Sequence, residues 1–394
     1  MELSRRMSAI AGSATLAALA KAKEMKAAGI DVASLTAGEP DFDTPQHIKV
    51  AALKALERGA TKYTPTSGLP ALREAVAEEF REAGIKCEAT DVLVSCGAKH
   101  SIYNALLAIL NEGDEAIVPA PYWVSYPEQV KCGGGTVKVV ATNEGTGFKM
   151  TPRKLAAAIG PKTKVVILNS PSNPTGSVYT REELEALGNV LVKHDGVLVL
   201  SDEIYNKLVY EELDTGSIAA IVPKIADRTI TVNGVSKTYA MTGWRIGYLT
   251  APREIIAIMS RLQDHSTSGP TTVSQEAALA ALTGDQSCVE EMRTEFDRRR
   301  GYIHERLNAL PKVRCAKPMG AFYVFPNVSE YFGRELEGKR IQGSTDFCGA
   351  LLSGAHVAIV PGEGFGADEC VRISYAASME TIEKAMDRMQ KFLA

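Results

Sequence analysis

The chain has 394 residues, of which 45% are hydrophobic and 23% are charged. These fractions are ordinary for a globular protein, and they exclude a disordered or fibrous chain. With 44 Lys and Arg against 47 Asp and Glu, the net charge is −3, so the basic excess typical of nucleic-acid-binding proteins is missing. No run of roughly 18 apolar residues could cross a membrane. We therefore expect neither a nucleic acid nor a membrane as a partner.

The cysteines indicate a reducing compartment. The 7 cysteines form no Cys-x-x-Cys pair and no Cys/His group with zinc spacing, so we expect no metal site. Free thiols of this kind are typical of a cytoplasmic protein. The Ala-rich stretch Met7–Ala20 is interrupted by polar residues, and we expect an N-terminal arm leading into an amphipathic helix rather than an export signal.

The first three quarters of the chain alternate between helical patterns and short β-branched runs. In chain order the expected elements are a helix at Pro70–Ala83, a strand at Val92–Val94, a helix at Lys99–Leu110, strands at Glu115–Val118, Val137–Val140 and Lys164–Leu168, a helix at Arg181–Lys193, strands at Val197–Leu200, Thr229–Val232 and Arg245–Leu249, and a helix at Ser274–Thr283. This alternation predicts a large α/β domain over residues 46–297, with a mostly parallel sheet between two layers of helices.

The pattern changes beyond residue 297. A charged helix is expected first, and short strands and a last helix follow it, at Asp297–Leu310, Ala321–Phe325, Val357–Ile359, Val371–Ser374 and Met379–Phe392. This succession predicts a smaller α+β domain over residues 298–394, which the N-terminal segment 1–45 joins.

Ligands of open α/β sheets bind beyond the carboxyl ends of the strands, so the polar residues that follow each strand are candidates for a site. The turn Ser95–Lys99 opens a helix and could bind a phosphate, although most such turns are only turns. The loop Asn169–Gly176 contains Ser-Pro and Asn-Pro steps that could aim Asn173 at a ligand, or could be a plain structural turn.

Two further segments carry a carboxylate and an amine. Asp202 follows a buried strand and would need a cationic partner there, although it could also be a helix N-cap. Lys237 lies between apolar segments, where desolvation would lower its pKa and free the amine to form a Schiff base. A phosphate site, a carboxylate for a ring cation and an amine together fit pyridoxal 5′-phosphate.

The chain resembles the class I aminotransferases of pyridoxal-phosphate fold type I, and within them the bacterial aspartate aminotransferase subgroup. The motifs that carry the resemblance run in the family's order over nearly the whole length, at residues 35–42, 63–69, 121–126, 173–176, 201–205, 236–245 and 371–374. The resemblance implies a large, mostly parallel seven-stranded sheet domain and a smaller α+β domain formed by the N- and C-terminal segments.

The same resemblance assigns the cofactor contacts. Lys237 would form the Schiff base and move a proton to and from the substrate Cα, and Asp202 would keep the ring nitrogen protonated. Tyr205 and Asn173 would hydrogen-bond the phenolic oxygen, and Trp123 would stack on the ring. The phosphate would be held by Gly97, Ala98, Ser236, Arg245 and, from the neighbouring subunit, Tyr63. A homodimer with shared active sites follows.

The resemblance also assigns substrate contacts. Arg372 would grip the α-carboxylate as a bidentate pair, with the backbone of Gly38 alongside, and Trp123 and Asn173 would line the same site. Lys99 would bind the distal carboxylate of a dicarboxylic substrate. Some relatives also accept prephenate with the help of a basic residue, and here Ala11–Gly12 precede the corresponding segment.

The implied activity is transfer of the amino group of L-aspartate to 2-oxoglutarate by a ping-pong route, which gives oxaloacetate and L-glutamate. Amino acids and 2-oxo acids would then be the small-molecule partners. The alternatives are an aminotransferase of alanine, aromatic or prephenate specificity, a β-lyase on the same fold, or a non-catalytic pyridoxal-phosphate regulator.

Overall fold

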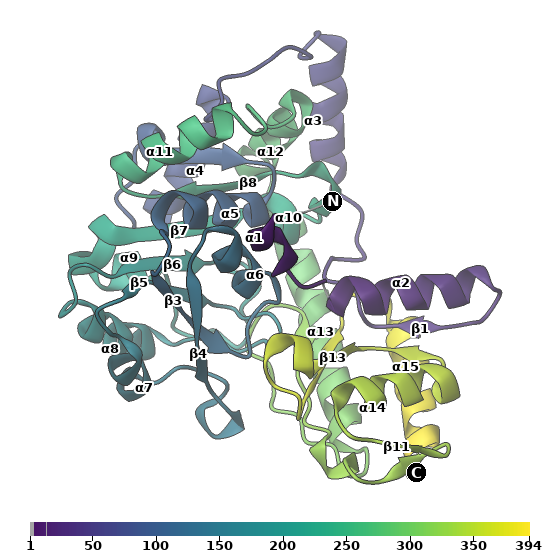
Figure 1. Ribbon diagram of the computed structural model, residues 1–394. Coiled ribbons are helices and arrows are strands. Elements are labelled where there is room, and N and C mark those ends of the chain that lie inside the picture. Colours follow the sequence, from purple (N-terminus) through teal and green to yellow (C-terminus); the bar gives the residue numbers. More distant parts are fainter. Residues whose placement is uncertain (1–3, 13) are drawn as a thin grey trace.

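The structure is a computed structural model that describes residues 4–12 and 14–394. Its centre is a seven-stranded sheet with the strand order β2-β8-β7-β6-β5-β3-β4 (Figure 1). The strands are β2 (Val92–Ser95), β3 (Glu115–Ala120), β4 (Thr136–Ala141), β5 (Thr163–Asn169), β6 (Leu198–Asp202), β7 (Thr229–Gly234) and β8 (Gly247–Thr250). Strand β8 runs antiparallel to β2 and β7, while the β3–β4, β3–β5, β5–β6 and β6–β7 pairs are parallel. The expected mostly parallel sheet is confirmed.

Both faces of this sheet are buried because successive strand residues are apolar on both sides. Val165 and Ile167 of β5 pack into one cluster, whereas Val166 and Leu168 pack into another on the opposite face. The first face is covered by α5 (Ala98–Ile109), α6 (Ser125–Cys132) and α11 (Arg253–Asp264). The opposite face is covered by α7 (Pro152–Ala158), α8 (Arg181–Leu191), α9 (Ile218–Ile221), α3 (Gln46–Glu57), α4 (Pro70–Glu82) and α12 (Thr272–Thr283).

The C-terminal part of the chain forms a second, smaller core. A three-stranded antiparallel sheet has the order β13-β14-β9, from β9 (Tyr323–Val324), β13 (Val360–Pro361) and β14 (Val371–Ser374). Helices α13 (Ser287–Asn308), α14 (Ser344–Ala350) and α15 (Met379–Leu393) pack on it. The hairpin of β10 (Glu335–Leu336) and β11 (Lys339–Arg340) completes this part.

The N-terminal segment lies against this smaller core. Strand β1 (Ala33–Ser34) pairs in parallel with β12 (Val357–Ala358), and α2 (Ala14–Ala27) runs beside them (Figure 1). The remaining α-helices are short: α1 (Arg5–Ser8) lies at the N-terminus, and α10 (Val235–Thr238) directly follows β7. Within residues 4–12 and 14–394, no helix has the length and apolar character needed to cross a bilayer.

Two expected elements differ in the structure. Helix α13 begins at Ser287, ten residues before the expected start at Asp297, because Met292 and Phe296 extend its buried apolar face. The expected domain boundary at residue 297 therefore falls inside a continuous helix, and the division itself stays a prediction. Helix α2 buries one face, with Ala22 buried and Ala18 and Met25 half-buried beside it, but its apolar residues are not confined to that face, since Leu16 is 63% exposed.

Candidate active site

Polar side chains at the carboxyl edge of the large sheet surround a cavity of about 510 Å³. The last residue of β6, Asp202, lies at its wall, and the segments that follow β2 and β7 bring Ala98 and Lys237 there. Gly38 and Arg372 close it from outside the sheet. This is the position where open α/β sheets bind ligands.

Arg245 reaches the same edge because β8 runs opposite to its neighbours. The strand begins at Gly247, so the residues just before it lie beside the ends of the adjacent strands. We expected Arg245 to open the strand, which was wrong, because its φ of 59° lies in the left-handed region rather than in the extended one. Its guanidinium donates to the carbonyl oxygens of Thr242 at 2.8 Å and Cys96 at 3.2 Å.

The first turn of α5 offers an anion site beside this guanidinium. Gly97 has a φ of 91°, which other residues rarely adopt, and a Cβ at this position would displace the guanidinium of Arg245, so glycine is favoured here. The helix begins at Ala98, where the first N–H groups have no acceptor inside the helix and the helix dipole favours negative charge. Ser236 also lines this part of the cavity. The chemistry of this donor set suits a phosphate.

Asp202 is a buried carboxylate at the wall of the cavity. Its side chain is 4% exposed, and burial raises its pKa to about 6. Oδ2 accepts a hydrogen bond from the hydroxyl of Tyr126 at 2.6 Å, and Oδ1 accepts one from the backbone N–H of Ile204 at 3.3 Å. The charge of Lys237 also lowers the pKa of Asp202, but no cation in the described part of the chain forms an ion pair with this carboxylate. A ligand cation in the cavity would supply the missing charge.

Lys237 is an amine with a strongly reduced basicity. Burial, as the largest cause, lowers its pKa to about 8. Nζ donates to the carbonyl oxygen of Gly38 at 2.6 Å. An amine with this pKa carries a substantial neutral fraction near neutral pH, so it can act as a nucleophile and a proton carrier.

Arg372 is a fully buried cation, 1% exposed, and among residues 4–12 and 14–394 the titratable groups that act on it are Tyr323 and Tyr205 rather than a carboxylate. Its guanidinium donates to the side-chain oxygen of Asn173 at 3.1 Å and to the carbonyl oxygen of Thr36 at 2.8 Å. Nothing in the described chain accepts a hydrogen bond from Nε. A buried guanidinium without an anionic partner is costly, so an anionic ligand that enters the cavity would bind to it favourably.

Lys99 adds a second positive charge to the cavity wall. Its ammonium group lies 4.9 Å from the ring centroid of Trp123. Desolvation, followed by repulsion from Arg245, lowers its pKa. The cavity therefore carries cationic groups at separate places on its wall, which suits a ligand with more than one negative group.

The structure brings most of the predicted site residues together. The residues that line the cavity are Gly38, Ala98, Lys99, Trp123, Asn173, Asp202, Tyr205, Ser236, Lys237, Arg245 and Arg372. Gly97 lies next to this set, in contact with Arg245. Tyr63 stands apart, with a fully exposed side chain. The described residues contain no group of three or more His, Cys, Asp or Glu that could hold a metal ion.

Sequence reasoning missed two tyrosines of the site. Tyr126, on α6, donates to Asp202, and its ring lies 5.2 Å from that of Trp123. Tyr323, on β9, places its hydroxyl 2.9 Å from that of Tyr205. The position of Tyr126 could have been predicted from the sequence. It lies three residues after Trp123, in the first turn of α6, so its side chain stays at the same edge of the sheet as Trp123.

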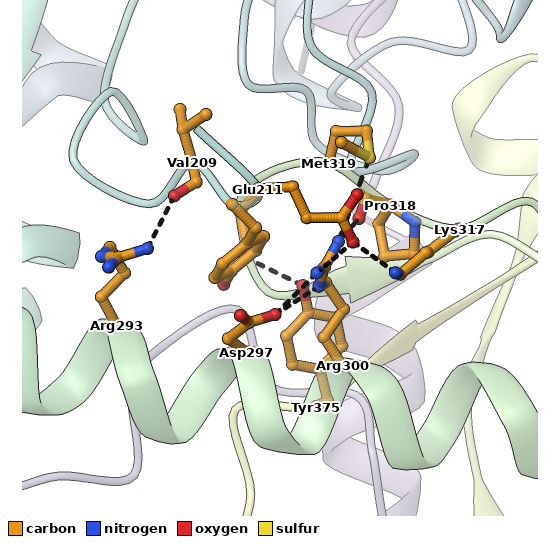
Figure 2. A network of polar contacts seen from close by, with 11 residues as sticks. Val209, Glu211, Arg293, Asp297, Arg300, Lys317, Pro318, Met319 and Tyr375 are labelled. Carbon is orange, nitrogen blue, oxygen red and sulfur yellow. Dashed lines mark hydrogen bonds and ion pairs between the residues drawn. The ribbon is translucent and has the colours of Figure 1, made fainter. Parts of the chain in front are cut away.

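An ion network joins α13 to segments on either side of the site. Figure 2 shows Arg300 between Asp297, at 2.7 Å, and Glu211, at 2.8 Å. It also donates to the carbonyl oxygen of Pro318 at 2.9 Å, and Lys317 pairs with Glu211. The network ties the segment after Tyr205 to the segment before Tyr323, so it fixes the backbone on both sides of that tyrosine pair.

Comparisons with known proteins agree with this geometry. The profile of the family "Aminotransferase class I and II" matches residues 30–389. Aspartate aminotransferase of Geobacillus stearothermophilus is 51% identical over 100% of this chain and 99% of its own length. Aspartate/prephenate aminotransferase of Cereibacter sphaeroides is 48% identical over 100% of this chain and 98% of its own. The structure of aspartate aminotransferase from Thermus thermophilus with maleate superposes with a TM-score of 0.94, at 44% identity over 100% of both chains.

The chain belongs to the class I and II aminotransferase family. Enzymes of this family use pyridoxal 5′-phosphate. The residues present fit that cofactor: Asp202 is a buried carboxylate that needs a cation, and a Cβ at Gly97 would fill the phosphate cradle beside Arg245. Lys237 is an amine of lowered pKa that can bind the aldehyde.

Proposed function

We propose that this aminotransferase moves the amino group of L-aspartate to 2-oxoglutarate by a ping-pong route. The observation that carries the proposal is the cavity with a buried, carboxylate-free Arg372 and a second cation at Lys99. L-Aspartate, oxaloacetate, L-glutamate and 2-oxoglutarate all carry two carboxylates, so one pair of cations serves both half-reactions. The full-length similarity to aspartate aminotransferases supports the same substrates.

The bound cofactor would supply an aldehyde and a ring that draws electrons from the substrate. Asp202 would hold the proton on the ring nitrogen, since its buried carboxylate gains a cation by doing so. Tyr205 and Asn173 would hold the phenolic oxygen, and Trp123 would cover one face of the ring.

Lys237 would carry the proton that leaves the substrate. Its pKa of about 8 allows Nζ to accept a proton from the substrate Cα and to give it back to the cofactor side. The carbonyl oxygen of Gly38 accepts a hydrogen bond from Nζ and would hold the amine in place between these two positions.

Arg372 would hold the α-carboxylate, and Lys99 the distal one. Thr36 and Asn173 already accept hydrogen bonds from two nitrogens of the guanidinium, so its plane is fixed before a ligand arrives. Such preorganisation orients the Cα–H bond without loss of side-chain entropy at binding.

We further propose a homodimer with shared active sites, in which Tyr63 reaches the phosphate of the neighbouring subunit. Its fully exposed ring supports this, as do the exposed side chains of Leu53 and Leu56 on α3. The cytoplasm is the proposed location, because the 7 cysteines are free. The proposed division of the chain is 46–297 for the cofactor domain, with 1–45 and 298–394 as the small domain.

The test is a half-reaction screen. The loaded protein is mixed with single amino acids, and the absorbance of the bound cofactor is followed. L-Aspartate and L-glutamate should convert the cofactor much faster than L-alanine, L-tyrosine or cystathionine, and Lys237→Ala should abolish the conversion, whereas the exposed Lys224→Ala should not. If L-alanine converted the cofactor fastest, or if cystathionine underwent β-elimination, the proposal would be contradicted. The acceptor half-reaction is tested with 2-oxoglutarate and prephenate, and a preference for prephenate would indicate a prephenate aminotransferase instead.

The shared site has its own test in mixed dimers of Lys237→Ala and Tyr63→Ala subunits. If Tyr63 serves the neighbouring subunit, each mixed dimer contains one site with both native residues. The mixture should then be more active than either variant alone. No gain on mixing would place Tyr63 in its own subunit's site or outside any site.

A further inference from the structure

Tyr323 occupies a position at the cavity wall that the roles proposed so far do not use. It comes from β9 of the smaller core, it is fully buried, and it lines the cavity. Its hydroxyl lies 2.9 Å from the hydroxyl of Tyr205, a distance at which one of the two donates to the other.

Tyr323 also contacts both other parts of the substrate site. The guanidinium carbon of Arg372 lies 4.7 Å from the centroid of its ring, within the range of a cation–π contact. A Cβ at Gly38 would come to 3.1 Å from the Tyr323 hydroxyl, so a larger residue would push on it. The same Gly38 accepts the hydrogen bond from Lys237. One side chain therefore touches the groups that hold the cofactor oxygen, the carboxylate and the amine.

The backbone around Tyr323 is held from several directions. Its strand pairs with β14, where Tyr323 lies opposite Ser374, two residues beyond Arg372. The carbonyl oxygen of Ala321 accepts hydrogen bonds from the hydroxyls of Tyr210 and Tyr375, at 2.5 Å and 3.1 Å. The Arg300 network fixes the segment just before it (Figure 2). The hydroxyl is thus preorganised, as a group that orients another must be.

We propose that Tyr323 is a positioning residue that donates a hydrogen bond to Tyr205 and holds the plane of Arg372, an inference that rests on the proposed function. A tyrosine hydroxyl has one proton to give. If Tyr205 gives its proton to the cofactor's phenolic oxygen, the bond between the two tyrosines must run from Tyr323 to Tyr205. Accepting that bond orients Tyr205 and makes it a stronger donor.

The two parts of Tyr323 have separable effects. Tyr323→Phe removes the hydroxyl and keeps the ring beneath Arg372, so kcat with L-aspartate should fall by about five- to tenfold, the range of one neutral hydrogen bond, while KM stays within about twofold. Tyr323→Leu also removes the ring and should raise KM for L-aspartate, because the guanidinium loses the ring that restrains its plane together with the hydrogen bonds to Thr36 and Asn173.

The hydroxyl also has a spectroscopic readout in the absence of substrate. Without the bond from Tyr323, the Tyr205 hydroxyl would be a weaker donor and would stabilise less negative charge on the phenolic oxygen of the bound cofactor. The midpoint of the pH titration of the bound cofactor's absorbance should therefore rise by about half a unit in Tyr323→Phe. Tyr331→Phe is the matched control, since it removes another buried hydroxyl of the same core, which donates to Pro311.

A double-mutant cycle tests whether Tyr323 acts through Tyr205. In a Tyr205→Phe background, Tyr323→Phe should have almost no additional effect on kcat or on the titration midpoint. Additive effects, or a Tyr323→Phe enzyme with native kcat and midpoint, would overturn the inference. These outcomes are read against a native enzyme that transaminates L-aspartate, so a native protein without that activity would refute the proposed function instead.

Discussion

The hydroxyl of Tyr126 donates a hydrogen bond of 2.6 Å to the buried carboxylate of Asp202. Burial raises the pKa of Asp202 to about 6, and this hydrogen bond opposes the rise. Tyr126 therefore keeps the carboxylate ionised over part of the pH range in which burial alone would protonate it. Since only the ionised form can stabilise a ring cation, a residue that need not touch the cofactor controls the charge that faces it.

Tyr126→Phe should reduce kcat with L-aspartate by about tenfold to a hundredfold, the range expected for a lost hydrogen bond to a charged group. The loss should be larger at low pH, because without Tyr126 the pKa of Asp202 rises further and the acid limb of the rate profile moves to higher pH. Rate profiles from about pH 5 to 8 measure this shift. The control is Tyr179→Phe, which removes a buried hydroxyl that contacts Met150 and should leave the acid limb at its native pH. If the acid limb did not move in Tyr126→Phe, Tyr126 would not control the charge of Asp202.

Lys99→Ala should separate dicarboxylic from monocarboxylic substrates. Loss of the charge 4.9 Å from the ring centroid of Trp123 should lower kcat/KM for L-aspartate by about tenfold to a hundredfold and change that for L-alanine by less than about twofold. Lys131→Ala is the control, because this lysine pairs with Glu128 on α6 outside the cavity wall. Equal losses for both substrates would show that Lys99 does not read the side chain.

The Arg300 network predicts an asymmetry in stability. Arg300 is 3% exposed, whereas Asp297 and Glu211 are each 41% exposed. Removing both carboxylates, in Asp297→Asn with Glu211→Gln, leaves a buried cation whose remaining polar partner is the carbonyl oxygen of Pro318, and it should cost about 3–5 kcal/mol of unfolding free energy. Arg300→Met leaves two solvated carboxylates and should cost less, about 1–2 kcal/mol. Urea unfolding of the cofactor-free protein measures both, and the reverse order would contradict the assignment.

Glu203 predicts a pH dependence of folding. It accepts hydrogen bonds from Ser201 and Ser217, and burial raises its pKa from 4.5 to about 7. The unfolded chain therefore releases this proton first, so the folded state loses stability as the pH rises from about 4.5 to about 7, by about 3 kcal/mol in total for this group. The buried carboxyls of Asp202 and Glu79 have pKa values shifted upward as well and add to the slope.

Glu203→Gln keeps the acceptor oxygen and removes the charge. Its free energy of unfolding, measured without cofactor from pH 5 to 8, should fall less steeply with pH than that of the native chain. The exposed Glu212→Gln is the control and should keep the native slope. A steeper slope in Glu203→Gln would show that the carboxylate is stabilised rather than penalised by its surroundings.

The large sheet could be predicted because its signals are local. Apolar residues on both faces of β5 and β6 and polar residues directly after them placed Asp202 and Asn173 at one edge without any tertiary information. Tyr323 could not be assigned in this way. Its place follows from pairing with β14 and from contact with Tyr205, which lies 118 residues earlier, and neither leaves a periodic pattern.

For Arg245 the sequence predicted the place in the site correctly but the local backbone structure wrongly. Its motif pointed to the phosphate, while the mostly apolar residues 246–249 after it suggested that the strand already began at Arg245. The left-handed φ depends on the turn before the strand and on the contact with Gly97, which a single-strand pattern does not contain. The small core was likewise harder to predict, since β9 and β13 are only two residues long.

The unsatisfied Nε of Arg372 has a consequence for how this protein responds to heat. When no anion is bound, the fold keeps a desolvated positive charge at a cost, and an anion that binds beside the guanidinium returns part of that cost. Dicarboxylates that cannot react should therefore raise the melting temperature, and the ranking of such shifts would reveal what shape of molecule the pocket has been selected to admit.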